Sequence, residues 1–538
     1  MVDELSQGDV GRAQTNSELA SDSAHKALVY TRGPVWWTAS KLPWIGDDVT
    51  AVRTVSEVVE DLTHNTVPQL VKAGGTFGPR SLNPKNGRID LSPIPAVAPV
   101  LEQGAQQIDA GRARVAAIPT DGLVEELRGP VRELQDKLTK ASSAASSAAL
   151  AAELMPAMLG ADGPRTYLAV FQNNAEIRAQ GGLTGAYALL RANDGKVRMV
   201  KQSRPADLGT FGPSFIDLTK EERSLFSTRL SIYPQDNTFV PDFPRSAEIL
   251  KQMWEAREPE KLDGVVSIDP VALGYLLGGT GPVKLRDGQT LDSGNAAAVL
   301  MRDVYLNIAD PEAQNNFFDD VARRVFGQVL GGADNPKSLL SGLTQAVGER
   351  RLMMWSAHSD EQQKLSGTPI AGELSGHVEK SPNVGVFIND SAADKLSYYL
   401  DYHVDVSPRS CGIDGNQIID VKLTMKSTVP EGTTGPRYLV GPPSNAVPPG
   451  VMLNTFYLYA PVDGRVDEVT SDGRPLPSAE DTYDGRDVSS TTVSLKPGEK
   501  RVIDYVVITG RNQTGDPTLT TTPAALGDGQ GFVGPSAC

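Results

Sequence analysis

A polar stretch between two strand-like segments contains the residues most able to do chemistry. It reads "FQNNAEIRAQGG", and its amide, charged and glycine residues are Asn173, Asn174, Glu176, Arg178, Gly181 and Gly182. Arginine binds phosphate through paired hydrogen bonds, and glycines let backbone N–H groups approach an anion closely. The same side chains can instead pair with one another or satisfy the backbone of a turn. The residue types therefore leave two alternatives open, a ligand site and a structural loop.

The elements around this stretch predict a layered α/β domain over residues 161–375. Strand-like runs precede and follow it, and an Asn-Asp-Gly turn at 193–195 predicts a hairpin. "PRSAEILKQMWEAR" is typical of a helix, and "DGVVSIDPVALGYLLGGTGPVKL" predicts a strand, a helix that starts at Asp269–Pro270 and a second strand. Alternating strands and helices of this kind form an α/β or α+β layered domain.

Residues 1–160 are expected to form a helical bundle or stalk. Apolar residues recur there every three or four positions, for example at Val124, Leu127, Val131 and Leu134. That spacing makes one apolar face along a helix, and several such faces can pack together. Within this region, "GPVWWTASKLPWIG" (33–46) holds three of the five tryptophans. They could form an aromatic belt at a membrane interface, or close one end of the bundle.

Residues 376–538 have the pattern of a β-sandwich, because short alternating runs are separated by Gly, Pro and Asp turns. The chain has two cysteines, Cys411 and Cys538. We expect a disulfide between them that ties down the C-terminus, with two free buried thiols as the alternative. "INDSAADK", with Asn389, Asp390 and Lys395, is interpreted as a polar turn that joins two domains.

Composition excludes several classes of protein. The net charge of −15 argues against nucleic acid as a partner, since phosphate binding needs a basic surface. No apolar run reaches the length of about 18 residues that suggests a membrane-spanning helix, and the first residues, "MVDELSQGDVGR", do not form a signal peptide. If the protein works outside the cytoplasm, its export signal or membrane anchor is missing from this sequence. No hydrolase, zinc-protease or nucleotide-binding motif is present.

Several segments resemble a family of unknown function found in actinobacterial envelope proteins. They are "GPVWWTASKLPWIGDDVTAVRTV", "FQNNAEIRAQGG", "DGVVSIDPVALGYLLGGTGPV" and "VGVFINDSAADKLSYYL". The resemblance covers most of the chain and implies an extracytoplasmic, envelope location, either anchored or secreted. It implies no settled activity.

The order of elements in the central domain is also similar to the LytR–CpsA–Psr phosphotransferases, which transfer polyprenyl-pyrophosphate-linked glycopolymers to peptidoglycan. That resemblance places Glu176 and Arg178 at the acidic-x-Arg loop, and Arg204 and Asp207 at the end of the hairpin. Arg302 lies where the helical arginines of those enzymes begin. The family's second acidic loop is replaced by "QGGLTG" and its downstream arginines by "DPEAQNNFF".

The resemblance implies Glu176, Arg178 and Arg204 as catalytic residues. It also implies a ligand-binding set of Asn173, Asn174, Gly181, Gly182, Asp207 and Arg302. Glu176 could hold Mg²⁺, which prefers oxygen ligands. We therefore expect a multi-domain α+β envelope protein that binds a polyprenyl-phosphate glycan or another cell-wall polymer, with transferase activity left open. The alternative is a non-catalytic structural or adhesive surface protein.

Overall fold

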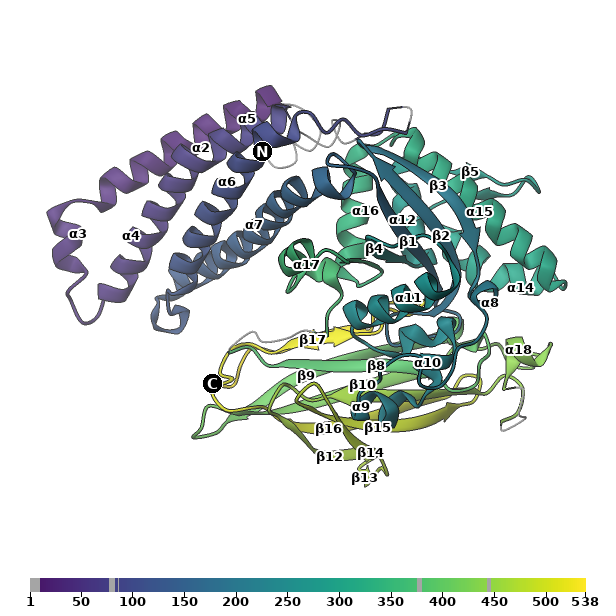
Figure 1. Ribbon diagram of the computed structural model, residues 1–538. Coiled ribbons are helices and arrows are strands. Elements are labelled where there is room, and N and C mark those ends of the chain that lie inside the picture. Colours follow the sequence, from purple (N-terminus) through teal and green to yellow (C-terminus); the bar gives the residue numbers. More distant parts are fainter. Residues whose placement is uncertain (1–9, 77–82, 86, 375–379, 443–446) are drawn as a thin grey trace. The chain divides into compact units, whose positions relative to one another are not determined.

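The computed structural model describes residues 10–76, 83–85, 87–374, 380–442 and 447–538 (Figure 1). The chain divides into two compact units. The first contains residues 1–165 with two short segments, 192–197 and 330–332, and the second contains the rest of the chain. The molecule is a multi-domain α+β protein, as predicted. The predicted boundary between residues 375 and 376 lies outside the described residues, and the three-domain division stays a prediction.

The first unit is built from helices. In chain order they are α2 (Val10–Thr31), α3 (Pro34–Ala39), α4 (Gly46–Asp61), η1 (Leu62–Thr66), α5 (Val67–Thr76), α6 (Ile94–Ala116), η2 (Thr120–Gly122) and α7 (Glu125–Met158). The longest of them run side by side in Figure 1. Their shared core contains Val58 of α4, Val115 of α6, and Val131 and Leu138 of α7. Of the four positions predicted from the three-and-four spacing, Val131 is buried, Leu127 and Leu134 pack partly buried against this core, and Val124 is exposed.

A five-stranded sheet forms one layer of the second unit, in the order β3-β2-β1-β4-β7. Its strands are β1 (Arg165–Asn173), β2 (Leu183–Asn193), β3 (Lys196–Ser203), β4 (Gly264–Ile268) and β7 (Leu352–Ser356). β1 and β4 are parallel, and β7 pairs with β4 in the antiparallel sense. The predicted hairpin is present, because Asp194 and Gly195 both adopt positive φ between β2 and β3.

Helices and two short strands lie around this sheet. They are α8 (Pro205–Leu208), α9 (Lys220–Phe226), α10 (Arg229–Ile232), η3 (Pro234–Phe239), α11 (Phe243–Arg257), α12 (Pro270–Thr280), β5 (Val283–Lys284), β6 (Thr290–Leu291), α13 (Ala296–Ala298), η4 (Val299–Asp303), α14 (Val304–Asn307), α15 (Pro311–Gly331), α16 (Pro336–Gly348), α17 (Ser359–Leu365) and η5 (Pro369–Ala371). The side chain of Asp269 accepts a hydrogen bond from the backbone of Ala272, so α12 starts as predicted.

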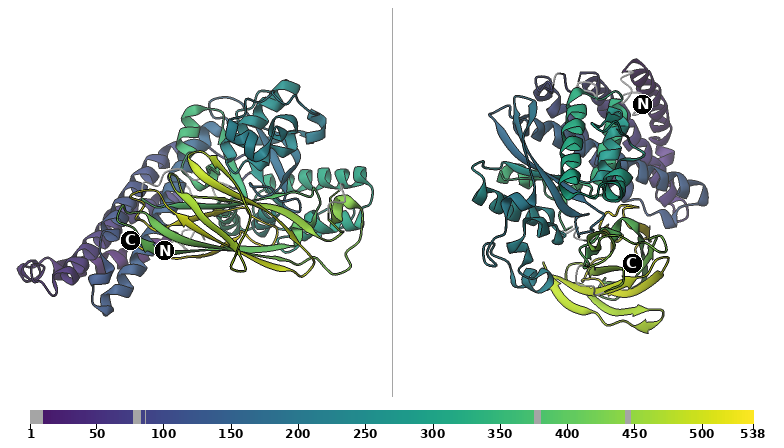
Figure 2. Two further views of the ribbon diagram at one scale, coloured as in Figure 1. Left: turned by 90° about the horizontal axis from the view of Figure 1, so that it is seen from below. Right: turned by 90° about the vertical axis from the view of Figure 1, so that its right-hand side faces the viewer.

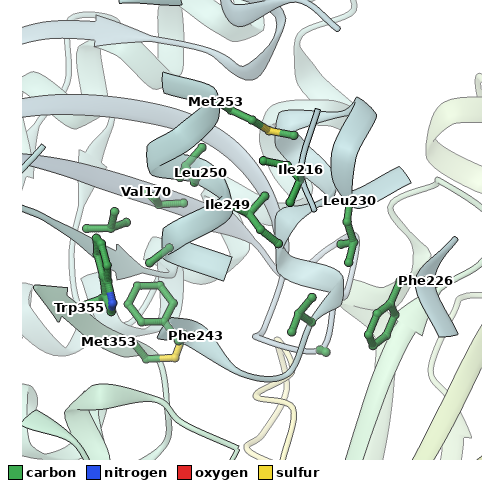
Figure 3. Packing of buried hydrophobic residues seen from close by; sticks show 14 of the residues in the cluster. Val170, Ile216, Phe226, Leu230, Phe243, Ile249, Leu250, Met253, Met353 and Trp355 are labelled. Carbon is green, nitrogen blue, oxygen red and sulfur yellow. The ribbon is translucent and has the colours of Figure 1, made fainter. Parts of the chain in front are cut away.

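One face of α11 packs into the largest apolar core of the second unit. Leu250, Met253 and Trp254 of α11 are fully buried there, together with Val170 and Val265 of the sheet. Figure 3 shows the start of α11 close to the two labelled residues of β7. The same core extends to four residues of a later sheet, Phe387, Tyr459, Tyr483 and Val488. The layers of the second unit therefore share apolar packing.

The C-terminal part of the chain is rich in strands, as predicted, and it forms two sheets. The six-stranded sheet has the order β13-β12-β16-β10-β9-β18, and the five-stranded sheet has the order β14-β15-β11-β8-β17. Their elements are β8 (Asn383–Asp390), η6 (Leu396–Tyr399), β9 (Leu400–Cys411), β10 (Gln417–Ser427), α18 (Arg437–Val440), β11 (Met452–Tyr459), β12 (Arg465–Ser471), β13 (Arg474–Pro475), β14 (Ala479–Tyr483), β15 (Arg486–Leu495), β16 (Lys500–Ile508), β17 (Thr518–Thr521) and β18 (Gln530–Val533). Figure 2 shows these green and yellow strands gathered in one region.

Residues from both sheets make one apolar core. Val386 and Phe456 belong to the five-stranded sheet, whereas Val404, Leu423 and Ile503 belong to the six-stranded sheet. All five are buried, because alternate side chains of each strand face the other sheet.

The last segment of the chain is fixed to these sheets in two ways. Strand β17 pairs in parallel with β8, and β18 pairs in parallel with β9. The predicted disulfide between Cys411 and Cys538 is present, and it closes a loop across a sequence separation of 127 residues. The C-terminus is therefore held to the end of β9 covalently.

Candidate functional site

The polar stretch singled out in the sequence forms the connection between β1 and β2. Its backbone folds back on itself, since the N–H of Leu183 donates to the carbonyl of Glu176 at 2.9 Å. The N–H of Gly181 donates to the carbonyl of Arg178 at 2.7 Å. From residue 174 to residue 183 every side chain except that of Leu183 is buried. The loop is consequently an interior element of the second unit.

The glycine pair lets the loop approach its own chain. A Cβ on Gly182 would lie 2.3 Å from the carbonyl carbon of Asn173, which no real side chain tolerates. The N–H of Gly182 donates to the side chain of Gln172 at 3.1 Å, and Gly181 has a φ of +128°. These glycines are needed for close packing of the loop on β1.

Glu176 and Arg178 bind each other and two residues from a distant part of the chain. Nη2 of Arg178 donates to Oε1 of Glu176 at 2.7 Å, and Nζ of Lys395 donates to Oε2 of Glu176 at 2.5 Å. Nη1 of Arg178 lies 3.7 Å from Oδ2 of Asp390. Only 2% of the Arg178 side chain is exposed. We call Glu176, Arg178, Asp390, Asp394 and Lys395 the buried charge cluster.

Backbone and aromatic groups complete the surroundings of Arg178. Nη1 donates to the carbonyl of Ile177 at 3.0 Å and to that of Asp390 at 3.4 Å. Its guanidinium carbon lies 4.6 Å from the ring centre of Phe239. The N–H of Ala179 donates to Oδ1 of Asn389 at 2.9 Å. The loop is thus bonded directly to the end of β8.

The carboxyl groups of the cluster divide into one ionised group and two that burial pushes toward the neutral form. Burial opposes ionisation of Glu176, but the adjacent Lys395 and Arg178 outweigh it and lower the pKa of this carboxyl. Burial raises the pKa of Asp390 to about 6 and that of Asp394 to about 8, and repulsion by Asp390 adds to the effect on Asp394. At neutral pH, Asp394 is therefore protonated and Asp390, with its lower pKa, is ionised. The cations Arg178 and Lys395 then face two carboxylates, Glu176 and Asp390.

A second buried network holds Asn174. Nδ2 of Asn174 donates to Oδ2 of Asp269 at 2.9 Å and to the carbonyl of Pro523 at 3.0 Å. Nη1 of Arg351 donates to the same Oδ2 at 2.8 Å, and Nη2 of Arg351 donates to the carbonyl of Ala524 at 2.9 Å. This network joins the loop after β1 to the start of α12, the start of β7 and the C-terminal segment.

Asn173 has a structural partner as well. Its Oδ1 accepts from the N–H of Ala175 at 3.1 Å, which is an Asx turn, and its Nδ2 donates to the hydroxyl of Tyr305. The ring of Tyr305 in turn lies 5.7 Å from Nζ of Lys395. Helix α14 is therefore bound to the loop through Asn173 and to the buried charge cluster through Lys395.

The remaining residues predicted to act at this site lie nearer the surface. Nη2 of Arg204 donates to Oδ2 of Asp319 on α15 at 2.8 Å, and 33% of the Arg204 side chain is exposed. Oδ2 of Asp207 accepts from the N–H of Arg204 at 2.8 Å, so Asp207 helps to start α8. Nε of Arg302 donates to Oδ1 of Asp303 at 2.7 Å.

Arg302 is the predicted arginine with the most varied surroundings. It lies in η4, a π-helical turn, and its guanidinium carbon is 5.5 Å from the ring centre of Tyr398. Met301 and Tyr398 share a small apolar cluster with Ala175 of the loop. The structure therefore brings Arg302 near the loop. Within the described ranges, no hydrogen bond or ion pair links Arg178, Arg204 and Arg302 to one another.

The groups around Glu176 fit a bound magnesium ion poorly. Both carboxylate oxygens accept from cationic side chains, Arg178 and Lys395, which repel a divalent ion. Across the part of the chain that the structure describes, no group of three or more His, Cys, Asp or Glu residues is placed to hold a metal. The described helices include none long and apolar enough to cross a membrane.

Residues 162–305 match a protein family of unknown function, DUF4012. The matched segment runs from β1 to α14 and contains the loop, Arg204 and Arg302. No curated protein matches the chain. Protein gbs0355 from Streptococcus agalactiae, a crystal structure, matches at 12% identity over 40% of this chain and 76% of that chain. The TM-score is 0.26, which is too low to indicate a shared fold.

Sequence reasoning did not identify most partners of the loop. The predicted site residues do not include Asp394, Arg351, Tyr305 or Phe239, and the sequence predicts Lys395 in a polar turn. A signal for Arg351 exists in "GERRLMMW", where charged residues stand directly before a buried strand. Charge at such a position often needs a buried partner, because an unpaired buried ion is costly.

Proposed function

We propose that this protein is a non-catalytic structural or adhesive component of the extracytoplasmic cell envelope. The observation that carries the proposal is the pairing of Arg178 with Glu176 inside the second unit, at 2.7 Å and with 2% of the arginine exposed. A group that binds a substrate must be reachable by it, and these groups are bonded to the protein itself. In this proposal the DUF4012 segment acts as a scaffold that the C-terminal sheets complete.

Two features support the envelope location. Cys411 and Cys538 are exposed and form a disulfide, which persists most readily in an oxidising compartment. The second feature is the resemblance of several segments to actinobacterial envelope proteins; the DUF4012 family matched by residues 162–305 is one of unknown function. In this proposal the partner is a cell-wall polymer or a second surface protein rather than nucleic acid.

Co-sedimentation with purified cell walls tests the structural proposal. The full chain is mixed with insoluble peptidoglycan that retains its attached polysaccharides, and bound protein is measured after centrifugation. We expect the wild type to bind the cell walls. The variants Arg302→Gln and Arg204→Gln should each change the amount of bound protein by less than about twofold, since neither side chain is part of the buried charge cluster. Self-association is measured in parallel by analytical ultracentrifugation. A monomer without affinity for cell walls would overturn the proposal.

The second candidate function is binding of a polyprenyl-phosphate glycan, with the LytR–CpsA–Psr resemblance as its basis. The specific observation in its favour is Arg302, which is partly exposed in a π-helical turn and lies over Tyr398. Such turns recur at functional sites, and arginine binds phosphate bidentately. Transferase activity, with or without Mg²⁺, belongs to this candidate.

Isothermal titration with a polyprenyl pyrophosphate separates the two candidates. Titrations are run with and without MgCl₂ on the wild type, on Arg302→Gln and on Arg323→Gln, an exposed arginine of α15 that serves as the control. The structural proposal predicts no saturable heat with any variant. A saturable heat that Arg302→Gln removes and Arg323→Gln retains would favour the glycan-binding candidate instead.

A further inference from the structure

The connection between α2 and α4 carries an unusual amount of exposed apolar surface. Trp44 is 89% exposed, Val35 76% and Trp37 59%. Leu42 and Ile45 are exposed as well, at 50% and 44%. We call residues 33–46 the apolar tip of the helical unit. The tryptophans do not close the end of the bundle here, because two of the three point into solvent.

The backbone of the apolar tip satisfies its own hydrogen bonds. The N–H groups of Lys41 and Leu42 donate to the carbonyls of Thr38 and Ala39 at 3.2 and 3.1 Å. The N–H of Gly46 donates to the carbonyl of Leu42 at 2.9 Å. A Cβ at Gly46 would lie 2.8 Å from the carbonyl oxygen of Ser40, so glycine makes this tight return possible. The apolar tip is a compact turn rather than an open loop.

The hydroxyl groups of the apolar tip also have partners within it. Oγ1 of Thr38 donates to the carbonyl of Val35 at 2.9 Å, and Oγ of Ser40 donates to the carbonyl of Trp37 at 2.8 Å. Entering an apolar medium is costly for polar groups that lose water without replacement. Internal bonding removes much of that cost for this segment, whereas its indole rings gain from an interfacial location.

The charge of the apolar tip is opposite to that of the protein. The whole chain has a net charge of −15, whereas Lys41 is the one charged residue of the apolar tip; Arg32 precedes the tip, and Asp47 and Asp48 follow it. On the connection between α6 and α7, Asp121 is paired with Arg132 at 2.9 Å. An anionic surface would therefore repel the apolar tip less than it repels the rest of the chain.

We propose that the apolar tip, residues 33–46, docks onto the surface of an anionic lipid bilayer. Trp37, Trp44 and Val35 enter the headgroup region, and Arg32 and Lys41 face the lipid phosphates. Aromatic rings flanked by cations are the composition that favours this depth in a bilayer, and the attraction to anionic lipid adds to the burial of apolar surface. The contact is peripheral.

Vesicle binding of the full chain tests this proposal. Vesicles contain either equal parts of phosphatidylglycerol and phosphatidylcholine or phosphatidylcholine alone, and bound protein is measured by co-sedimentation. We expect the anionic vesicles to bind more protein. The double variant Trp37→Ser/Trp44→Ser should weaken binding by about tenfold or more, because it removes most of the inserting surface. Arg32→Gln/Lys41→Gln should weaken binding to the anionic vesicles only.

Two controls make the result specific. Ile413→Ser/Phe532→Ser removes two exposed apolar side chains of the C-terminal part of the chain and should leave vesicle binding unchanged. Tryptophan emission should shift to shorter wavelength on binding and be quenched by brominated lipid. Trp254 and Trp355 are buried in the second unit, so they contribute little to that change.

Three outcomes would overturn the proposal. The first is no binding of the wild type to either kind of vesicle. The second is equal binding of the wild type and Trp37→Ser/Trp44→Ser. The third is a concentration-dependent dimer that the same double variant abolishes, with no vesicle binding, since the apolar tip would then pair with a second copy of the chain. Circular dichroism of the variants checks that the helices are intact.

Discussion

Replacing Arg178 with methionine tests whether the loop after β1 is a structural element. Methionine keeps most of the apolar stem but removes the guanidinium. The nitrogens of that guanidinium lie 2.7 Å from a carboxylate oxygen of Glu176 and 3.7 Å from one of Asp390. It also removes the contact with the ring of Phe239 at 4.6 Å. Removing one partner of a buried ion pair costs about 3–5 kcal/mol, because the other charge stays buried without compensation.

The assay is urea unfolding followed by tryptophan emission. Trp254 and Trp355 lie in the core of the second unit, so the component of the transition that they report belongs to this unit. We expect its free energy of unfolding to fall by about 3–5 kcal/mol in Arg178→Met. Arg178→Lys should lose less stability than Arg178→Met, because lysine keeps the positive charge but not the bidentate hydrogen-bonding geometry of arginine.

Arg204→Met is the matched control. Arg204 is also an arginine paired with a carboxylate at 2.8 Å, but a third of its side chain is exposed. Ion pairs at the surface contribute about 0–1 kcal/mol, since water screens them. If Arg178→Met costs no more than Arg204→Met, the structural role of the Arg178 guanidinium is refuted.

Three further predictions concern the same unit. Burial raises the pKa of Asp394 to about 8 from 3.8, so the folded chain holds a proton that the unfolded chain has released. The free energy of unfolding should therefore fall as pH rises between these values. Urea titrations at several pH values should show that Asp394→Asn flattens this dependence on pH; an unchanged dependence refutes the assignment of the proton to Asp394. Reducing the Cys411–Cys538 disulfide, which closes a loop across 127 residues, should lower the free energy of unfolding by about 2–5 kcal/mol, and an unchanged urea midpoint would contradict this. Gly182→Ala should destabilise by about 1–3 kcal/mol. Gly129→Ala should not, because its added Cβ has no atom within 4 Å apart from its chain neighbours and the backbone of its own helix; equal midpoints would count against the packing argument.

Local signals in the sequence predicted the elements that neighbouring residues determine. The hairpin between β2 and β3 follows from Asp194 and Gly195, which accept positive φ. The start of α12 follows from Asp269, whose carboxylate caps the helix, and the alternation of apolar residues identified the strand-rich C-terminal part. Each of these depends on interactions within a few residues, which the sequence displays directly.

The partners of the loop could not be predicted in this way. Lys395 is 219 residues from Glu176 in the sequence, and nothing in "INDSAADK" shows which carboxylate it binds. Arg351 and Asn174 meet at Asp269 only because β7 and β1 lie on either side of β4. Pairing between residues so far apart in the sequence is decided by the order of the strands in the sheet. The residue types alone therefore do not decide whether the segment is a ligand site or a structural loop.

The balance of charge in the buried cluster bears on where a ligand could bind. With Asp394 protonated, Arg178 and Lys395 face two carboxylates, Glu176 and Asp390, and the cluster is neutral. An anionic ligand at Arg178 would have to displace Glu176 and leave that carboxylate buried beside a second anion, which costs more than a surface contact returns. Recognition of an anion by this chain is therefore more favourable at its surface. Arg302, which lies over Tyr398, is the partly exposed arginine at which the second candidate function places a negatively charged ligand without that cost.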